Sequence, residues 1–178
     1  MSFDYKAKWD KCADFHGHVC KGLVTGYLAA IYASRLLDLE YSTDEQVVCI
    51  SENDACGVDA IQVITGCTAG KGNLLFHMTG KSAYSFYSRA NGKSIRLVVT
   101  GSIPDPKEVD IPAFATMENL EKVFTVKETK ITLPERARIF DSYVCECCGE
   151  KAGANWIRIQ DGKTLCLDCA NKYDRFNV

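Results

Sequence analysis

The segment CECCGEKAGANWIRIQDGKTLCLDC (145–169) decides the fold of the C-terminal part of this chain. It reads C-x2-C, a gap of 17 residues and a second C-x2-C, with the cysteines at Cys145, Cys148, Cys166 and Cys169. Two thiolates three positions apart can bind along one edge of a tetrahedron, and a second pair supplies the opposite edge. The spacing predicts a structural zinc site, because four thiolates leave no coordination position for a substrate.

The residues between the two cysteine pairs predict how the chain brings them together. Asp161-Gly162 lies between the short segments WIRI (156–159) and KTL (163–165), and this dipeptide is typical of the turn of a β-hairpin. The second pair then opens a predicted final helix, whose N-terminus favours the thiolate form. A knuckle, a hairpin and a ligand pair at a helix start follow the order of a treble-clef zinc finger. Cys147 is a surplus thiol, and the alternative for the whole group is a reduced or disulfide-linked cysteine cluster.

Length and composition limit the rest of the chain. It has 178 residues, a net charge of -2, 47% hydrophobic and 25% charged residues, enough for one core of about 100 to 150 residues plus a small appendage. We therefore expect a core domain at 1–140 and the zinc finger at 141–178. No run of about 18 apolar residues predicts a membrane span. Ten cysteines without an apolar signal segment predict a reducing, cytoplasmic location.

The core reads as a mixture of helices and strands without regular βαβ alternation. Asn91-Gly92 lies between two strand-like runs and predicts a hairpin, whereas Pro104, Pro106 and Pro112 predict a loop. Helices are expected at 4–15, 23–39, 58–65 and 116–124, and strands at 46–51, 74–78, 82–89 and 94–100, with 126–133 as a further strand or extended linker. The fold class is therefore α+β, with a mixed or antiparallel sheet and packed helices.

A second group of metal-binding residue types lies near the N-terminus, in the segment His16-Gly-His18-Val-Cys20. In an extended backbone all three side chains point to one side. In a helix only His16 and Cys20 would share a face. Gly17 and Gly22 favour the extended or irregular form, which would bring the three side chains together.

Further cysteines extend this group. Cys20 precedes the helix expected at 23–39 and Cys56 precedes the one at 58–65, and the helix dipole lowers the pKa of a thiol in such a position. We predict a core metal site made of His18, Cys20 and Cys56, with His16 and Cys67 as further candidates. Such ligands suit zinc, nickel or iron as a second transition metal. Cys20 and Cys56 are also the candidate nucleophiles, and the alternative is ordinary buried cysteines and hydrogen-bonded histidines.

Three motifs together resemble the family named for the E subunit of formylmethanofuran dehydrogenase. They are FHGHVCKGL (15–23), SENDACGVDAIQVITGCTAGKGNL (51–74) and the C-terminal four-cysteine module, so the resemblance covers nearly the whole chain. It implies an α+β core, an auxiliary treble-clef zinc finger in some members, and a cleft where His18, Cys20 and Cys56 match the family's metal or active site. It also implies a homodimer and association with a molybdenum or tungsten oxidoreductase of one-carbon metabolism. Lys21 stands where many members have proline.

The sequence leaves open whether this protein is an enzyme. One hypothesis is a metal-binding accessory protein of one-carbon or redox metabolism, and the other is a metal- or cysteine-dependent enzyme of unknown substrate. A zinc-finger regulator that binds nucleic acid is disfavoured by the acidic balance, with 21 basic and 23 acidic residues. Metal exchange without turnover would favour the accessory protein over the enzyme.

Overall fold

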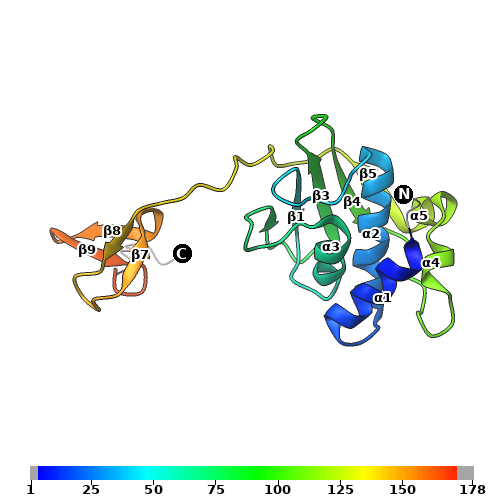
Figure 1. Cartoon of the computed structure of the whole chain (residues 1–178), viewed down its shortest axis with the longest axis horizontal. Helices are drawn as coiled ribbons and strands as arrows, with labels where there is room; N and C mark the ends of the chain where they lie inside the picture. The colour runs from blue at the N-terminus through cyan, green and yellow to red at the C-terminus, as the bar shows by residue number, and fades with distance from the viewer. Residues whose placement is uncertain (1–3, 172–178) are drawn as a thin grey trace. The chain divides into compact units, whose positions relative to one another are not determined.

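The computed structural model describes residues 4–171, and the chain divides into two compact units, Met1–Ala137 and Arg138–Val178 (Figure 1). The division falls three residues before the end of the core domain expected from the sequence. That each unit folds independently remains a prediction. Within residues 4–171, none of the helices combines the length and the apolar character that a membrane span requires.

The first unit contains a five-stranded mixed sheet. Its order is β2-β1-β3-β4-β5, in which β1 and β2 run parallel and the other neighbours run antiparallel. The strands are β1 (Val47–Ser51), β2 (Leu74–Phe76), β3 (Ala83–Ser88), β4 (Ser94–Val99) and β5 (Phe124–Lys127). The expected α+β class is therefore confirmed. The expected hairpin at Asn91-Gly92 joins β3 to β4, and Gly92 has the positive φ of 71° that such a turn requires.

The helices of the first unit are α1 (Tyr5–His16), α2 (Lys21–Leu37), α3 (Gly57–Thr65), α4 (Ile111–Phe114) and α5 (Met117–Val123). The helix α4 lies in a segment that we expected to be a loop because of its prolines. Pro112 falls in the first turn of α4, where its missing N–H leaves no helical hydrogen bond unmade, and the Asp110 side chain caps the turn. The strand β5 begins directly after α5, two residues earlier than expected.

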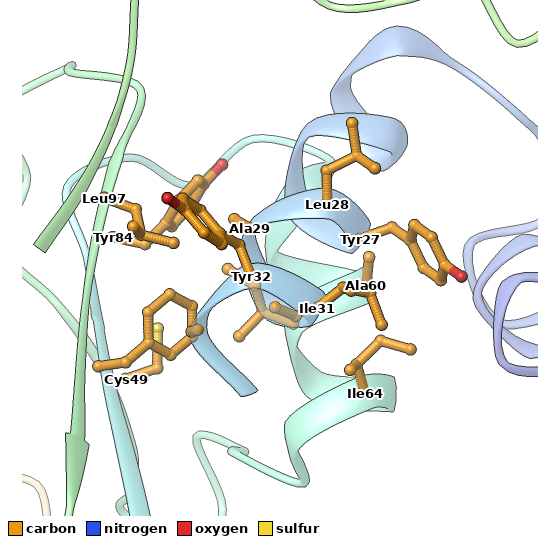
Figure 2. Close-up of a cluster of buried hydrophobic side chains, with 14 of the residues drawn as sticks. Tyr27, Leu28, Ala29, Ile31, Tyr32, Cys49, Ala60, Ile64, Tyr84 and Leu97 are labelled. Atoms are coloured by element: carbon orange, nitrogen blue, oxygen red, sulfur yellow. The ribbon is translucent and has the colours of Figure 1, made fainter. Parts of the chain in front are cut away.

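The helix α2 forms the centre of the core. It is apolar on every side and buried continuously from Leu23 to Ala33, as expected for a helix surrounded by other elements. Figure 2 shows side chains of α2 and α3 facing Cys49, Tyr84 and Leu97 of the sheet. The helices α2 and α3 approach closely at two glycines, since a Cβ on Gly26 would lie 1.8 Å from the carbonyl oxygen of Gly57.

The other face of the sheet is covered by the chain that follows β5. Val48, Ile50 and Tyr87 form a small apolar cluster there, and Ile131 packs against it. The Tyr87 hydroxyl donates to the Ile131 carbonyl oxygen over 2.6 Å, and Arg89 donates to the Pro134 carbonyl oxygen over 2.7 Å. The segment leading to the end of the first unit is therefore fixed along this face.

The second unit contains two small antiparallel sheets. One pairs β6 (Ser142–Val144) with β7 (Lys151–Gly153), and the other pairs β8 (Ile157–Gln160) with β9 (Lys163–Cys166), with the 3-10 turn η1 (Ala154–Trp156) between them. The predicted hairpin at Asp161-Gly162 is confirmed, and both residues have positive φ, at 52° and 76°, as a type I′ turn requires. The final helix predicted to begin at Cys166 is wrong for its first residues, because Cys166 ends β9 and residues 167–169 form a turn. The part of that predicted helix from residue 172 onward lies outside the described residues.

Candidate metal centres

The four cysteines of the second unit come together as their spacing predicted. One atom from each of Cys145, Cys148, Cys166 and Cys169 lies within 4.8 Å of all the others, and the Sγ atoms of Cys148 and Cys166 are 4.0 Å apart. Tetrahedral zinc with Zn–S bonds of ~2.3 Å places its sulfurs about 3.8 Å apart. The size and ligand chemistry of the group therefore fit a zinc ion.

The electrostatics of this group also fit a bound cation. Backbone N–H groups of Cys148 and Cys166 lower the pKa of Cys145 to about 6, and the Cys166 N–H donates to its sulfur over 3.3 Å. Hydrogen bonding with the thiols of Cys166 and Cys148 raises the pKa of Cys169 well above its usual range. Four thiolates at this separation repel one another, and a divalent cation removes that repulsion. Cys147 is exposed and does not belong to the group.

A second group of this kind lies in the first unit. Within residues 4–171, His16, Cys20 and Cys56 are the other three residues whose ligand atoms lie within 4.8 Å of one another. His16 is the last residue of α1, Cys20 is the N-cap of α2, and Cys56 is the N-cap of α3. Three helix ends therefore meet at one point, and each contributes one side chain.

The two ring nitrogens of His16 have separate partners. Nε2 lies 3.9 Å from the Cys20 Sγ atom, and Nδ1 lies 2.7 Å from Oδ2 of Asp59 in α3. With Nδ1 on the carboxylate, Nε2 is the ring nitrogen that faces Cys20. A histidine that binds a metal is usually held in this way by a carboxylate on its other nitrogen. The Asp59 contact also raises the pKa of His16.

The Cys20 thiol is held in a form that favours ionisation. Burial opposes its charge, but hydrogen bonds from the Leu23 N–H and from the Cys56 and His16 side chains lower its pKa below the usual 9.0. The Leu23 bond is 3.3 Å long, so the sulfur occupies the position that a serine or aspartate oxygen takes in an ordinary N-cap. Burial and the neighbouring Cys20 raise the pKa of Cys56.

The absence of a side chain at Gly22 allows the Cys20 and Cys56 thiols to lie close to each other. A Cβ on Gly22 would lie 3.0 Å from the Cys56 Cβ atom, 3.5 Å from its sulfur and 3.7 Å from the Cys20 sulfur. The Gly26–Gly57 contact one turn further along α2 holds the start of α3 against α2. A side chain at Gly22 would crowd Cys56, and one at Gly26 would force the backbones of α2 and α3 to shift.

The group is open on one side. A surface pocket of about 440 Å³ reaches His16 and Cys56 and is also lined by Asp54, Asp59 and Phe76. All three candidate ligands are partly exposed. Three protein ligands with access from a pocket leave a fourth coordination position for a water, a small molecule or a transferred ligand.

Two of the candidates from the sequence lie elsewhere. The extended or irregular form expected for residues 16–20 is wrong for His16, which is the last residue of α1, and Gly17 ends that helix with a φ of 84°. Residues 17–20 are irregular, and the backbone of Cys20 is extended, as expected. The His18 ring is exposed and lies against the His16 ring, with centroids 4.4 Å apart. Cys67 is fully buried, and its thiol donates to the Val47 carbonyl oxygen over 3.4 Å. Asp59 is not among the site residues predicted from the sequence, although its position three residues after Cys56 indicates a shared face of α3.

Comparisons with known proteins agree with this division of the chain. Residues 15–144 match the family model described as "FmdE, Molybdenum formylmethanofuran dehydrogenase operon", and residues 138–175 match the prokaryotic dksA/traR C4-type zinc finger. The fold resembles the crystal structure of a tungsten formylmethanofuran dehydrogenase FmdE-like protein from Syntrophus aciditrophicus. That chain is 22% identical, with a TM-score of 0.61 over 94% of this chain and 92% of the other, and the likeness concerns the fold alone.

A curated relative from Archaeoglobus fulgidus is named "Probable S-adenosyl-L-methionine-binding protein". It is 30% identical over 195 residues, which cover 92% of this chain and 52% of the relative. This chain therefore spans about half the length of that relative. The family model covers most of the first unit, including His16, Cys20, Cys56 and Asp59, and the zinc-finger model covers all four cysteines of the second. The chain belongs to the FmdE family and carries a C4-type zinc finger after its core.

Proposed function

We propose that the protein binds a transition metal in its core through His16, Cys20 and Cys56, and that it acts as a cytoplasmic accessory protein of one-carbon or redox metabolism. The observation that carries this proposal is the placement of His16, with Nδ1 on Asp59 and Nε2 facing Cys20. A hydrogen-bonded structural histidine would need only one of these contacts. The zinc in the finger is structural, since its four thiolates complete the coordination.

The ligand set of the core suits an exchangeable metal. Two thiolates and one imidazole favour zinc, nickel or iron(II) over magnesium or calcium. The open side toward the pocket allows the metal to enter and leave, or to accept a fourth ligand from another molecule. These properties suit a protein that delivers or senses a metal.

A matched pair of variants tests the site. His16→Ala removes the ring that faces Cys20, whereas His18→Ala removes the exposed ring beside it. Full-length protein purified without added metal is analysed by inductively coupled plasma mass spectrometry. We expect the parent and His18→Ala to contain the core metal in addition to the finger zinc, and His16→Ala to contain the finger zinc alone. Loss of the core metal in His18→Ala with retention in His16→Ala would contradict the assignment.

The proposed partners follow from family membership. The family description and the name of the similar protein from Syntrophus aciditrophicus mention molybdenum and tungsten formylmethanofuran dehydrogenases. We therefore propose a homodimer that associates with a molybdenum or tungsten oxidoreductase complex. Light scattering of the purified protein measures its oligomeric state. Copurification of a molybdenum or tungsten oxidoreductase with the tagged chain tests the association with that enzyme. A monomer at micromolar concentration would contradict the dimer.

A second candidate function is a cysteine- or metal-dependent enzyme. The lowered pKa of Cys20 beside His16 is the observation that favours it, because such a pair resembles an activated nucleophile. The name of the Archaeoglobus relative suggests S-adenosylmethionine as a ligand. Equilibrium dialysis with labelled S-adenosylmethionine, followed by product analysis, separates the two functions. Binding with turnover favours the enzyme, and metal exchange without turnover favours the accessory protein.

A further inference from the structure

A second pocket lies next to the pocket beside the core metal centre, and the two share Gln62 as a lining residue. The second pocket, of about 450 Å³, is lined by Lys11, Phe15, Tyr41, Gln62, Val63 and Thr68. Gln62 lines both pockets, and its amide donates to Oδ1 of Asp59 over 3.3 Å. The two pockets therefore lie on either side of the Gln62 side chain. We call them together the α1–α3 groove.

The packing of the helices gives this groove its direction. The end of α1 lies beside the start of α3, where His16 contacts Asp59. Lys11 lies about one and a half turns earlier in α1, beside Gln62 further along α3. Five residues of α-helix span about 8 Å. The groove is therefore long enough for a bicyclic ring system between the metal centre and Lys11.

The chemistry of the far half of the groove is aromatic and cationic. Phe15 and Tyr41 are both 59% exposed, although large aromatic side chains usually bury most of their surface. Lys11 has no carboxylate partner within residues 4–171. Two exposed aromatic faces suit a planar ring, and an unpaired ammonium suits an anionic substituent on it.

We propose that the α1–α3 groove binds a planar aromatic anion, with its charged group at Lys11, its ring against Phe15 and Tyr41, and its other end at the open side of the core metal centre. The contact with the metal centre rests on the proposed function. The contacts of the ring with Phe15 and Tyr41 and of the charge with Lys11 depend only on the far half of the groove. The ligand class is a bicyclic aromatic or heteroaromatic carboxylate that carries a soft donor atom at the opposite end.

The first test uses 2-naphthoate as the probe and isothermal titration calorimetry on the full chain. We expect saturable binding with one site per chain. Phe15→Ala, Tyr41→Ala and Lys11→Gln should each weaken it at least about fivefold, by loss of one stacking or charge contact. Cyclohexanecarboxylate, which has the charge without the aromatic face, should bind at least about tenfold more weakly. Because all three residues are on the surface, the variants should keep the parent's thermal midpoint.

Trp156→Ala supplies the control, since Trp156 is an exposed aromatic of the zinc finger. It should bind 2-naphthoate as the parent does. Equal affinity in Trp156→Ala, Phe15→Ala and Tyr41→Ala would show adsorption to exposed aromatics in general and would overturn the proposal. Absence of saturable binding to the parent at millimolar concentrations would overturn it as well.

The second test asks whether the ligand reaches the metal. The probe is 6-mercapto-2-naphthoate, with a phosphine reductant present, and the protein is the cobalt-loaded full chain. We expect at least about tenfold tighter binding than for 2-naphthoate and a change in the cobalt absorption. Cys56→Ser, without core metal, should bind both probes equally through the ring and charge contacts. Equal affinity of the parent for the two probes, with core cobalt present, would overturn the contact with the metal. Absence of core cobalt in the parent would instead contradict the proposed function, and 2-naphthoate binding would still test the groove.

Discussion

His16 and Asp59 lie in different helices, and the 2.7 Å contact between Nδ1 of the ring and Oδ2 of the carboxylate sets the direction of the whole core site. With Nδ1 occupied, Nε2 is the nitrogen left to face Cys20. Asp59 is itself held by Gln62 from the next turn of α3. A chain of contacts therefore runs from Gln62 through Asp59 to His16 and on to Cys20.

This relationship predicts the effect of Asp59→Asn. The variant keeps the shape of the side chain but removes the charge that stabilises the Nδ1 proton and the basicity of Nε2. We expect the affinity for the core metal to fall about 10- to 100-fold, as is usual when such a partner is lost. Competition with a chromophoric chelator measures it. Asp54→Asn, a carboxylate in the same pocket with no contact to His16, should change the affinity less than about twofold. Equal losses in the two variants would show a general charge effect.

The zinc finger predicts a difference between two neighbouring thiols. Cys148→Ser should lose the finger zinc and the folded structure of residues 142–171, because so small a unit depends on metal binding for its folding free energy. Cys147→Ser should keep both, since Cys147 lies outside the four-cysteine group. Amide NMR spectra and zinc content measure the outcome. A folded finger in metal-free protein would contradict the structural role of the zinc.

The close approach of α2 and α3 predicts a severe effect of Gly26→Ala. The new Cβ would lie 1.8 Å from the Gly57 carbonyl oxygen. Neither atom can move without a shift of the backbone of α2 or α3. We expect a loss of about 3 kcal/mol or more in the free energy of unfolding, at or above the upper end for overpacked sites. Gly70→Ala is the matched control, because its Cβ would meet nothing within 4 Å. Urea unfolding curves compare the two, and a Gly26→Ala protein as stable as the control would contradict the packing.

The buried ion pair of Glu52 with Arg96 predicts a pH dependence of stability. Arg96, with its charged hydrogen bonds, lowers the pKa of Glu52 below the usual 4.5, and Arg96 Nη2 lies 2.9 Å from Glu52 Oε2. Since the folded-state pKa is the lower one, the stabilisation is fully present above pH 4.5 and is lost as the pH falls through the folded pKa. Thermal midpoints between about pH 6 and 3 should fall more steeply in the parent than in Glu52→Gln.

The same pair predicts the cost of removing one partner. Both side chains are almost fully buried, at 7% and 4% exposure. Arg96→Met leaves the carboxylate without its cation and should cost about 3–5 kcal/mol. The double variant Glu52→Gln/Arg96→Met should recover part of this loss, because the unpaired charge is gone. No recovery in the double variant would show that the packing of Arg96, and not its charge, is what matters.

The sequence predicted those parts of the structure that depend on local spacing. The two C-x2-C pairs predict the four ligands of the finger, and Asp161-Gly162 predicts its hairpin. The four-cysteine group and the hairpin are both as expected. Helix and strand positions in the core follow from apolar periodicity and from turns such as Asn91-Gly92. The sequence does not predict α4, because its prolines indicate a loop, although Pro112 lies in the first turn, where a helix accepts it.

The core site could be predicted only in part, because its geometry depends on tertiary contacts. Cys20 and Cys56 were identified from their positions before helices, which local patterns reveal. The choice between His16 and His18 depends on whether α1 continues to residue 16, and the Asp59 contact that orients the ring comes from a helix 43 residues away in the sequence. Cys67 follows the end of α3, whereas Cys56 precedes its start, and the structure buries Cys67 with its thiol on the Val47 carbonyl oxygen.

The most direct test of the central claim is a cobalt(II) titration of the metal-free full chain, with the thiolate-to-cobalt absorption followed to saturation. The parent is compared with the double variant Cys20→Ser/Cys56→Ser and with Cys67→Ser as a buried-cysteine control. We predict two cobalt ions per chain for the parent and for Cys67→Ser, and one ion per chain, with the absorption of a four-thiolate site, for the double variant. An equal number of bound ions in the parent and the double variant would contradict a metal site at His16, Cys20 and Cys56.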